Sequence, residues 1–410
     1  MVTPSAPPIG LAVFRGADGP GGMGRMGREL LSHWAPSDLA WREARIRRVR
    51  VPLAGYIPTG TIIPRACAVA YLPHIWGASA LGRIRLPSVV TVHDLGCMEC
   101  PADRASAPRP WTWVMEREVR ALAHASRLVA VSDFTRTRLF EHVPGLIPGR
   151  VSVIHHGVSD SLLESASGNR ARNRRALTAA IPGVRSRSRL MVYVGDEAPR
   201  KNIPLLLETL RSLKGRYPTL QLLKIGTALT ASGRQRTLNH MKRLRLGPGR
   251  DVIFTETIPD PLLAICYRAS DVYVSASLYE GFGLPPLEAL ASGLPVVATR
   301  RGAHVELLRH RAILVEPERS AMVAAVRCEL EMPYRPRRVD SLRAEMGLYR
   351  WNRTAAAYTE LFVSLARRSA GSGLVAAESR QTHRGGGRCG TEGIEGPEDP
   401  NGTDASEPGF

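Results

Sequence analysis

Long apolar runs and cysteines are scarce in this 410-residue sequence. No apolar run approaches the roughly 18 residues that a helix needs to cross a bilayer, and the run at residues 9–14 is short even for a signal peptide. Without either feature, we expect a cytoplasmic protein. Six cysteines in a chain of this length, without a signal peptide, do not indicate a disulfide framework.

Two of these cysteines, Cys97 and Cys100, form a C-x-x-C pair. Such a pair can be half of a zinc site or a redox centre, but no second pair has ligand spacing and the flanking residues do not resemble a redox turn. Two incidental loop cysteines are the better interpretation. No D-x-D follows a predicted strand, so we expect no metal site.

Lysine is also rare, because only four of the 56 basic residues are Lys. The formal net charge is +19, and since residues 371–410 hold three Arg and seven Asp or Glu, the preceding residues carry +23. A chain this basic is attracted to anionic surfaces. The arginines are scattered and do not form a basic helix face interleaved with aromatics. Peripheral association with an anionic membrane, or an anionic substrate, is therefore favoured over specific nucleic-acid binding.

The sequence does contain a repeated alternation of short apolar runs and helical patterns. Strands are predicted at 11–14, 46–51, 68–72, 88–92, 128–131 and 151–154, and again at 190–194, 220–225, 252–255, 272–275, 295–298 and 312–315. Helical patterns, with 133–142 and 284–291 among them, lie between many of these runs, which indicates parallel sheets covered by helices on both faces. Segment 165–189 breaks the alternation. We predict an α/β fold of two Rossmann-like, doubly wound domains that face a cleft.

The end of the chain departs from this alternation. Residues 340–368 show only helical patterns, and the residues beyond 370 are rich in Gly, Ser, Glu and Pro. We therefore predict an N-terminal domain at 1–182, a second domain at 183–350, a final helix at 351–369 and a disordered tail at 370–410.

The stretch 270–305 contains the most informative motif, E-G-F-G-L-P-P-L-E-A-L-A. A strand is followed by a glycine-containing loop, and Pro285 and Pro286 can occupy the first turn of the next helix. A helix N-terminus behind such a loop is an anion site. Glu280 lies in the loop and Glu288 lies in the second turn of the helix, so the pair can reach two parts of one extended ligand.

This stretch resembles the signature of the retaining glycosyltransferases with the GT-B fold, family 4 in particular. The resemblance extends over roughly residues 9–368, and it implies that Glu280 contacts the donor sugar and that Glu288 binds the nucleotide ribose. Carboxylates accept hydrogen bonds from hydroxyl groups, and backbone amides donate to phosphate oxygens. The amides expected to line the sugar and diphosphate are those of Gly281, Phe282, Gly283 and Leu284.

A second motif, V-G-D-E-A-P-R-K-N, follows the predicted strand at 190–194. A cation in a strand-to-helix loop can bind a diphosphate. The segment is similar to the family's V-G-x-x-x-P-R-K-N, which implies that Lys201 binds the donor diphosphate and that Arg200 is a second cation. Many relatives have Arg directly after the glycine, whereas this chain has Asp196.

Histidine follows the predicted strand at 88–92, in the motif T-V-H-D. Ligands bind at the carboxyl ends of parallel strands in open α/β sheets, so this position favours a functional histidine. The motif resembles the family's T-x-H-D, and this resemblance implies that His93 hydrogen-bonds the donor sugar. Ser132 and Asp133 are expected to line the cleft. His156 stands where the family usually has asparagine.

Residues 22–27, G-M-G-R-M-G, match the dinucleotide-binding pattern G-x-G-x-x-G. The predicted strand ends eight residues earlier, whereas the dinucleotide fingerprint turns tightly off its strand. The segment instead resembles the family's G-G-x-G-R loop, so Gly22 and Gly24 are expected to approach the donor diphosphate or the acceptor. An NAD(P)-dependent oxidoreductase remains an alternative.

Together these resemblances imply a retaining hexosyltransferase, with His93, Lys201 and Glu280 as its catalytic residues. The expected donor is a nucleotide-diphosphate sugar, GDP-mannose first and UDP-glucose or another UDP- or GDP-hexose next. The expected acceptor is a polysaccharide or lipid-linked glycan. The resemblance also implies that the final helix crosses back onto the N-terminal domain. A catalytically degenerate nucleotide-binding protein is the other alternative.

Overall fold

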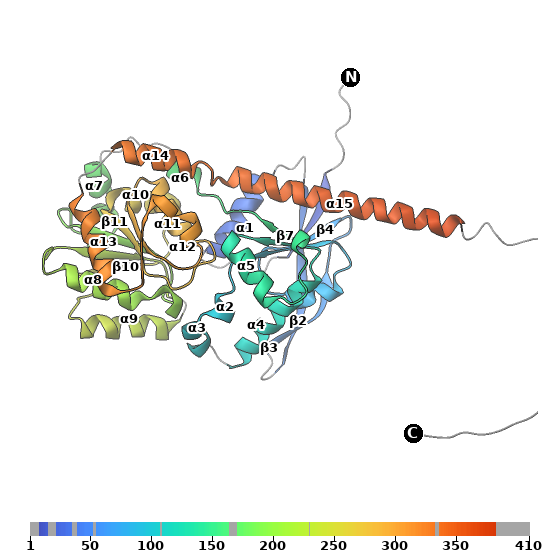
Figure 1. Ribbon diagram of the computed structural model, residues 1–410, viewed down its shortest axis with the longest axis horizontal. Helices are drawn as coiled ribbons and strands as arrows, with labels where there is room; N and C mark the ends of the chain where they lie inside the picture. Colours follow the sequence, from blue (N-terminus) through green and yellow to red (C-terminus); the bar gives the residue numbers. More distant parts are fainter. Residues whose placement is uncertain are drawn as a thin grey trace, which may run out of the picture. The chain divides into compact units, whose positions relative to one another are not determined.

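The computed structural model describes residues 8–14, 22–34, 39–51, 55–106, 109–163, 170–228, 230–332 and 336–382. Residues Met1–Ala366 form one compact unit, and the chain from Arg367 onward belongs to a second. The description below concerns the first unit, which contains two separate sheets (Figure 1).

The first sheet has seven strands in the order β3-β2-β1-β4-β5-β6-β7. Every neighbouring pair is parallel except β2 and β3. The strands are β1 (Ile9–Phe14), β2 (Leu39–Val51), β3 (Gly55–Ile62), β4 (Val69–Leu72), β5 (Ser88–Val92), β6 (Arg127–Ala130) and β7 (Val151–Val153). Its helices are α1 (Gly22–His33), α2 (Gly96–Glu99), α3 (Pro101–Ser106), α4 (Arg109–Ala121) and α5 (Asp133–His142).

The second sheet has six parallel strands in the order β10-β9-β8-β11-β12-β13. The strands are β8 (Leu190–Val194), β9 (Gln221–Ile225), β10 (Val252–Thr255), β11 (Val272–Ser275), β12 (Val296–Thr299) and β13 (Ile313–Val315). The remaining helices are α6 (Asp160–Leu163), α7 (Arg170–Ala180), α8 (Ile203–Leu213), α9 (Ala231–Arg243), α10 (Asp260–Ala269), α11 (Leu284–Ala291), α12 (His304–Leu307), α13 (Arg319–Glu331), α14 (Pro336–Met346) and α15 (Trp351–Thr382). These two sheets confirm the predicted α/β fold class.

Strand order reverses once in each sheet, between β1 and β4 and between β8 and β11. In open α/β sheets, ligands bind outside the carboxyl ends of the strands at such a reversal. The loops that leave β8 and β11 carry the two strongest sequence motifs. The topology therefore brings those motifs to the place where a ligand is expected.

Helix α15 packs on the first sheet although it follows the last helix of the second. Its Tyr358 hydroxyl lies 2.7 Å from the Thr91 hydroxyl of β5, and Phe362 packs edge-on against Trp34 and Tyr71. All these side chains are buried, so the predicted crossing back onto the first sheet is confirmed (Figure 1). The helix extends to Thr382, past the predicted end at 369, so residues 370–382 are helical. The rest of the predicted tail lies outside the described residues.

Several elements were not predicted, namely strand β3, helix α7 and the short helices α2, α3, α6 and α12. Strand β3 contains Pro58 and pairs antiparallel with β2 at the sheet edge, where proline is tolerated. Helix α7 falls within the predicted break at 165–189 and packs against α10, with Leu177 fully buried. The predicted domain boundary at 182 stays a prediction.

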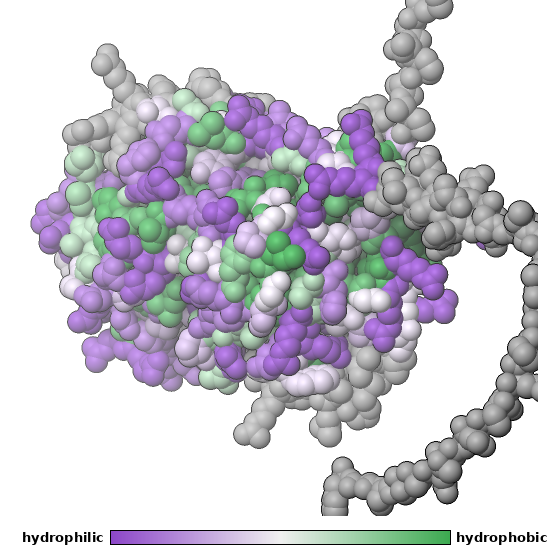
Figure 2. Space-filling view, turned by 45° about the vertical axis from the view of Figure 1, so that its right-hand side comes forward, coloured by the Kyte–Doolittle hydropathy of each residue, from purple (hydrophilic) through white to green (hydrophobic). Residues whose placement is uncertain are grey.

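On the face shown in Figure 2, hydrophilic residues are scattered among hydrophobic ones. This distribution agrees with the scattered arginines of the sequence. Within the described residues, every helix is too short or too polar to span a bilayer.

Candidate active site

Lys201 and Glu280 meet at the strand reversal of the second sheet. Lys201 ends a short 3₁₀ turn after β8, Pro199–Lys201, and Glu280 lies in the loop after β11. The Lys201 Nζ donates to Glu280 Oε1 over 2.6 Å. The Leu278 amide donates to the Arg200 carbonyl over 2.7 Å, which ties the two loops together. The structure thus brings two of the predicted catalytic residues into contact.

The charge state of Glu280 follows from its neighbours. Burial alone would raise the pKa of this carboxyl group, but the charges of Lys201, His304 and Arg200 outweigh it and lower the pKa to about 2. Glu280 is therefore an ionised hydrogen-bond acceptor at neutral pH. Such a group can bind a sugar hydroxyl.

The loop at 281–284 lies against the first sheet's domain. A Cβ on Gly281 would overlap the carbonyl oxygen of His93, so this position requires glycine. The Gly281 carbonyl accepts hydrogen bonds from the hydroxyls of Ser132, over 2.5 Å, and Thr135, over 3.1 Å. Gly283 has φ +82 and precedes the first turn of α11. The side chain of Ser132, which was expected to line the cleft, thus holds the glycine loop through the backbone carbonyl of Gly281.

Glu288 is almost fully buried in α11, and both of its oxygens have partners. Oε2 accepts from the Tyr267 hydroxyl over 2.9 Å, and Oε1 accepts from Arg25 Nη1 of α1 over 2.5 Å. Burial raises the pKa of Glu288, although Arg25 and Tyr267 act in the opposite direction. Arg25 was not singled out from the sequence, although it follows Gly24 within the quoted G-x-G-R motif.

Arg200 lies among acidic groups from both sheets' domains. Its side chain pairs with Asp103 of α3 over 3.3 Å, and its amide donates to the same carboxylate over 3.0 Å. Burial would lower the pKa of Arg200, but Asp94, Asp196 and Glu280 raise it. Arg200 is thus a permanent cation beside Glu280.

Asp196, the departure from the family pattern, has a structural partner. Its Oδ1 accepts from the Ala198 amide over 2.8 Å. The aspartate therefore stabilises the turn that carries Arg200 and Lys201, instead of supplying a cation itself.

The departure at His156 also has a structural partner, His93. His93 Nε2 lies 2.8 Å from the carbonyl of Pro73, so this nitrogen must carry the proton. His93 Nδ1 then accepts from His156 Nε2 over 3.2 Å. Burial lowers the pKa of both rings, so both are neutral. Both ring nitrogens of His93 are thus engaged, and the predicted bond to a donor sugar would have to replace either the Pro73 carbonyl or His156.

A charge cluster of Glu197, Lys224 and Arg234 was not predicted from the sequence. Glu197 Oε1 lies 3.2 Å from Lys224 Nζ at the end of β9 and 2.8 Å from Arg234 of α9. Burial lowers the pKa of Lys224 although Glu197 acts against it. The rarity of lysine was the signal that could have found this cluster, because Lys224 is one of four lysines and lies within the predicted strand 220–225.

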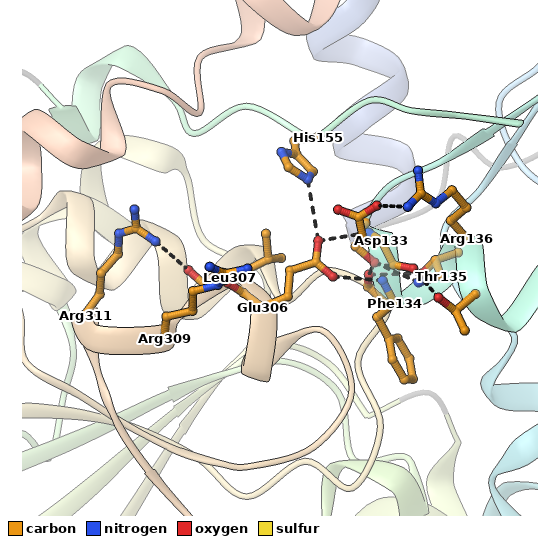
Figure 3. Close-up of polar contacts among 12 residues, drawn as sticks. Asp133, Phe134, Thr135, Arg136, His155, Glu306, Leu307, Arg309 and Arg311 are labelled. Carbon is orange, nitrogen blue, oxygen red and sulfur yellow. Dashed lines mark hydrogen bonds and ion pairs between the residues drawn. The ribbon is translucent and has the colours of Figure 1, made fainter.

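A further contact between the two sheets' domains is centred on Glu306 of α12 (Figure 3). Its carboxylate accepts from the amides of Asp133, over 2.9 Å, and Phe134, over 2.8 Å, at the start of α5. The His155 Nε2 lies 3.6 Å from Oε1, the oxygen that also accepts from the Asp133 amide. A carboxylate at a helix N-terminus is electrostatically favourable. The predicted Asp133 is therefore placed by its backbone at an inter-domain contact.

The remaining sequence candidates are the glycines at 22–27 and the cysteine pair Cys97 and Cys100. Helix α1 begins at Gly22, so the three glycines of the G-x-G-x-x-G pattern lie within its first two turns, and Gly24 is buried there. Their contact with a donor or acceptor stays a prediction. Cys97 and Cys100 are free, and burial raises the pKa of Cys97 to about 12, so that thiol is unreactive.

A cavity of about 920 Å³ opens beside the turn that carries Lys201. It lies between α3, α8 and α9, and its lining includes Pro199, Asn202, Arg236 and Lys242. The cavity adjoins the candidate site but does not include Lys201, Glu280 or Glu288.

Comparison with known proteins agrees with this geometry. Residues 66–162 match Glycosyltransferase Family 4, and residues 176–341 match Glycosyl transferases group 1. The chain is 32% identical over 306 residues to a D-inositol 3-phosphate glycosyltransferase of Geodermatophilus obscurus, covering 70% of this chain and 65% of the relative. It is 31% identical over 251 residues to that of Acidothermus cellulolyticus, covering 58% of this chain and 53% of the relative. The chain thus spans about half of the length of several such relatives.

Solved structures share the fold. The sucrose-phosphate synthase of Thermosynechococcus elongatus superposes with a TM-score of 0.69 at 21% identity, covering 87% of this chain and 99% of that one. The structure of Anabaena HepE in complex with UDP and glucose superposes with a TM-score of 0.62 at 17% identity, covering 88% of this chain and 98% of that one. These likenesses confirm the GT-B fold. The chain therefore contains a segment similar to Glycosyltransferase Family 4, at 66–162, followed by a segment similar to Glycosyl transferases group 1, at 176–341.

Proposed function

We propose that this glycosyltransferase moves a hexose from a nucleotide-diphosphate sugar to an acceptor with retention of anomeric configuration. The observation that carries the proposal is the meeting of Lys201, Arg200 and Glu280 at the strand reversal of the second sheet, with the buried Glu288 in the second turn of the helix that follows Glu280. Cations suit a diphosphate, and ionised carboxylates suit sugar and ribose hydroxyls.

The proposed chemistry needs the developing charge of the departing diphosphate to be stabilised. We assign this task to Lys201 Nζ, Arg200 and the N-terminal amides of α11, because cations and free amides stabilise phosphate oxygens. In this structure Lys201 pairs with Glu280. A bound donor would therefore insert its phosphate oxygens beside Lys201 and its sugar hydroxyls beside Glu280. The leaving diphosphate would assist deprotonation of the acceptor on the same face of the sugar.

The donor and the acceptor are the finer part of the proposal. GDP-mannose is the first donor to test, and UDP-glucose and other UDP- or GDP-hexoses follow. A polysaccharide or lipid-linked glycan is the first acceptor. D-inositol 3-phosphate is a second candidate, because relatives at about 30% identity carry that name and a chain of net charge +19 suits an anionic acceptor.

Peripheral association with an anionic membrane is part of the same proposal. It is supported by the formal charge of +19. Co-sedimentation with anionic vesicles should decline as the salt concentration rises, because exposed charges are screened. Co-sedimentation that is unchanged at high salt would contradict an electrostatic origin.

The decisive experiment is an assay of hydrolysis and transfer over a panel of GDP-, UDP- and ADP-sugars. We expect the wild-type protein to release nucleoside diphosphate from one donor, and Glu280→Ala to lose most of that activity. A product of inverted anomeric configuration would contradict retention. Identical wild-type and Glu280→Ala traces would instead favour a degenerate nucleotide-binding protein.

A further inference from the structure

Arg25 connects two parts of the chain that are far apart in sequence. Its guanidinium, on α1 beside the first sheet, lies 2.5 Å from Glu288 Oε1 and 3.0 Å from Asp260 Oδ2, both beside the second sheet. The side chain of Arg25 is 15% exposed and that of Glu288 only 2%. This contact is therefore a largely buried, charge-assisted bridge between the two sheets' domains.

The bridge occupies the carboxylate to which a donor ribose is expected to bind. Tyr267 already holds Glu288 Oε2, so Oε1 is the oxygen that faces the first sheet's domain through Arg25. A buried carboxylate without a partner is costly, which means that Glu288 exchanges one donor for another and does not give one up. A ribose hydroxyl that donates to Oε1 would therefore have to take the place of Arg25 Nη1.

We propose that Arg25 is an internal competitor of the nucleotide, a latch that closes α1 against α10 and α11 until ribose hydroxyls replace it on Glu288. Asp260 keeps the second guanidinium nitrogen, so Arg25 stays at the edge of the pocket after the exchange. The inference rests on the proposed function, because it takes Glu288 as the ribose ligand. It makes Arg25 a residue that sets donor affinity through the closure of the two domains.

The first test uses the full chain without nucleotide. Hydrogen exchange is followed at the amides of α1 and α11 in the wild type, Arg25→Gln and Arg28→Gln. Arg28 is the matched control, because it lies on the same helix and is exposed. Loss of the latch should speed exchange in both helices by about tenfold in Arg25→Gln, since a charge-assisted hydrogen bond is worth at least about that factor. Unchanged exchange in Arg25→Gln would overturn the latch.

The second test measures the affinity for GDP, UDP and ADP by calorimetry. Arg25→Gln should bind the preferred nucleotide about tenfold more tightly than the wild type, and Arg28→Gln should match the wild type. Arg25→Lys keeps the charge but lacks the planar fork of the guanidinium, so its nucleotide affinity should fall between those of the wild type and Arg25→Gln. In a protein that already carries Glu288→Gln, adding Arg25→Gln should leave the nucleotide affinity unchanged.

The outcomes separate this inference from the proposed function. Weaker or unchanged nucleotide binding by Arg25→Gln, with normal binding by the wild type, would overturn the inference alone. Absence of nucleotide binding by all the proteins would overturn the proposed function and the competition with it. If Arg25→Gln were to fold poorly, Arg25→Lys would give the same comparison in a protein that retains the charge.

Discussion

Lys201 is the residue on which the proposed chemistry depends most directly. Replacing it by alanine removes a cation 2.6 Å from Glu280, and the loss of one such electrostatic donor costs about 10²–10³ in rate. We therefore expect Lys201→Ala to lower the transfer rate by that factor. Lys242→Ala is the control, because Lys242 is exposed on α9. A transfer rate for Lys201→Ala close to that of Lys242→Ala would contradict the role of Lys201.

The ionisation of Glu280 should be visible in the pH dependence of stability. Its folded-state pKa of about 2 lies below the ordinary value of 4.5, so the ionised group stabilises the fold above pH 4.5. That contribution is lost as the pH falls through 4.5 toward 2. The free energy of unfolding should therefore fall more steeply over this range in the wild type than in Glu280→Gln. Superimposable profiles of the two proteins would argue against a paired, ionised Glu280.

Individual site residues could be predicted from the sequence where a motif follows a strand. Lys201 and Glu280 could be assigned because their motifs follow predicted strands, and parallel strands end at a common edge. Arg25 could not be paired with Glu288 from the sequence, because the two lie 263 residues apart and are joined only by the packing of one domain on the other. The His93–His156 pair was out of reach for the same reason.

At the scale of elements, local signals decided what could be predicted. The starts of α5 and α11 were predicted correctly, because the Ser132 side chain accepts from the Thr135 amide as an N-cap and prolines occupy the first turn of α11. Helix α7 was missed because its arginines disrupt the apolar pattern. Their charge is accommodated in the fold, since Asp271 lies 2.6 Å from Arg170 and 3.0 Å from Arg174.

Helix α7 should therefore depend on Asp271. The Asp271 side chain is only 8% exposed, and removing one partner from a buried charge cluster costs about 3 kcal/mol. We expect Asp271→Asn to lower the free energy of unfolding by about that amount in urea titrations. Asp160→Asn is the matched control. Its pair with Arg350 is about half exposed, so the cost should stay under about 1 kcal/mol.

A similar loss of stability in the two variants would show that α7 is not held by charge. The comparison also bears on the predicted break at 165–189. A large effect of Asp271→Asn would confirm that α7 is an integral part of the second sheet's domain.

At the scale of the whole molecule, polar contacts join the domains of the two sheets. They include Arg25 with Glu288, Arg200 with Asp103, Ser132 with Gly281, and Glu306 with the start of α5. Helix α15 adds an apolar connection through Tyr358 and Phe362. Polar contacts of this kind can exchange partners, whereas the apolar core cannot. The contacts therefore suit two domains that close around a ligand and open again.

The central claim is that a nucleoside diphosphate binds between these domains through Lys201 and Glu288. Calorimetric titration of GDP, UDP and ADP into the wild type, Lys201→Ala, Glu288→Gln and Arg25→Gln tests it most directly. One nucleotide should bind the wild type, and Lys201→Ala should weaken that binding by about tenfold or more, since it removes a charge-assisted hydrogen bond. Glu288→Gln should bind that nucleotide more weakly than Arg25→Gln by a similar factor, since in Arg25→Gln no guanidinium competes for Glu288. Failure of the wild type to bind any of the three nucleotides, or equal affinity in all four proteins, would contradict the account.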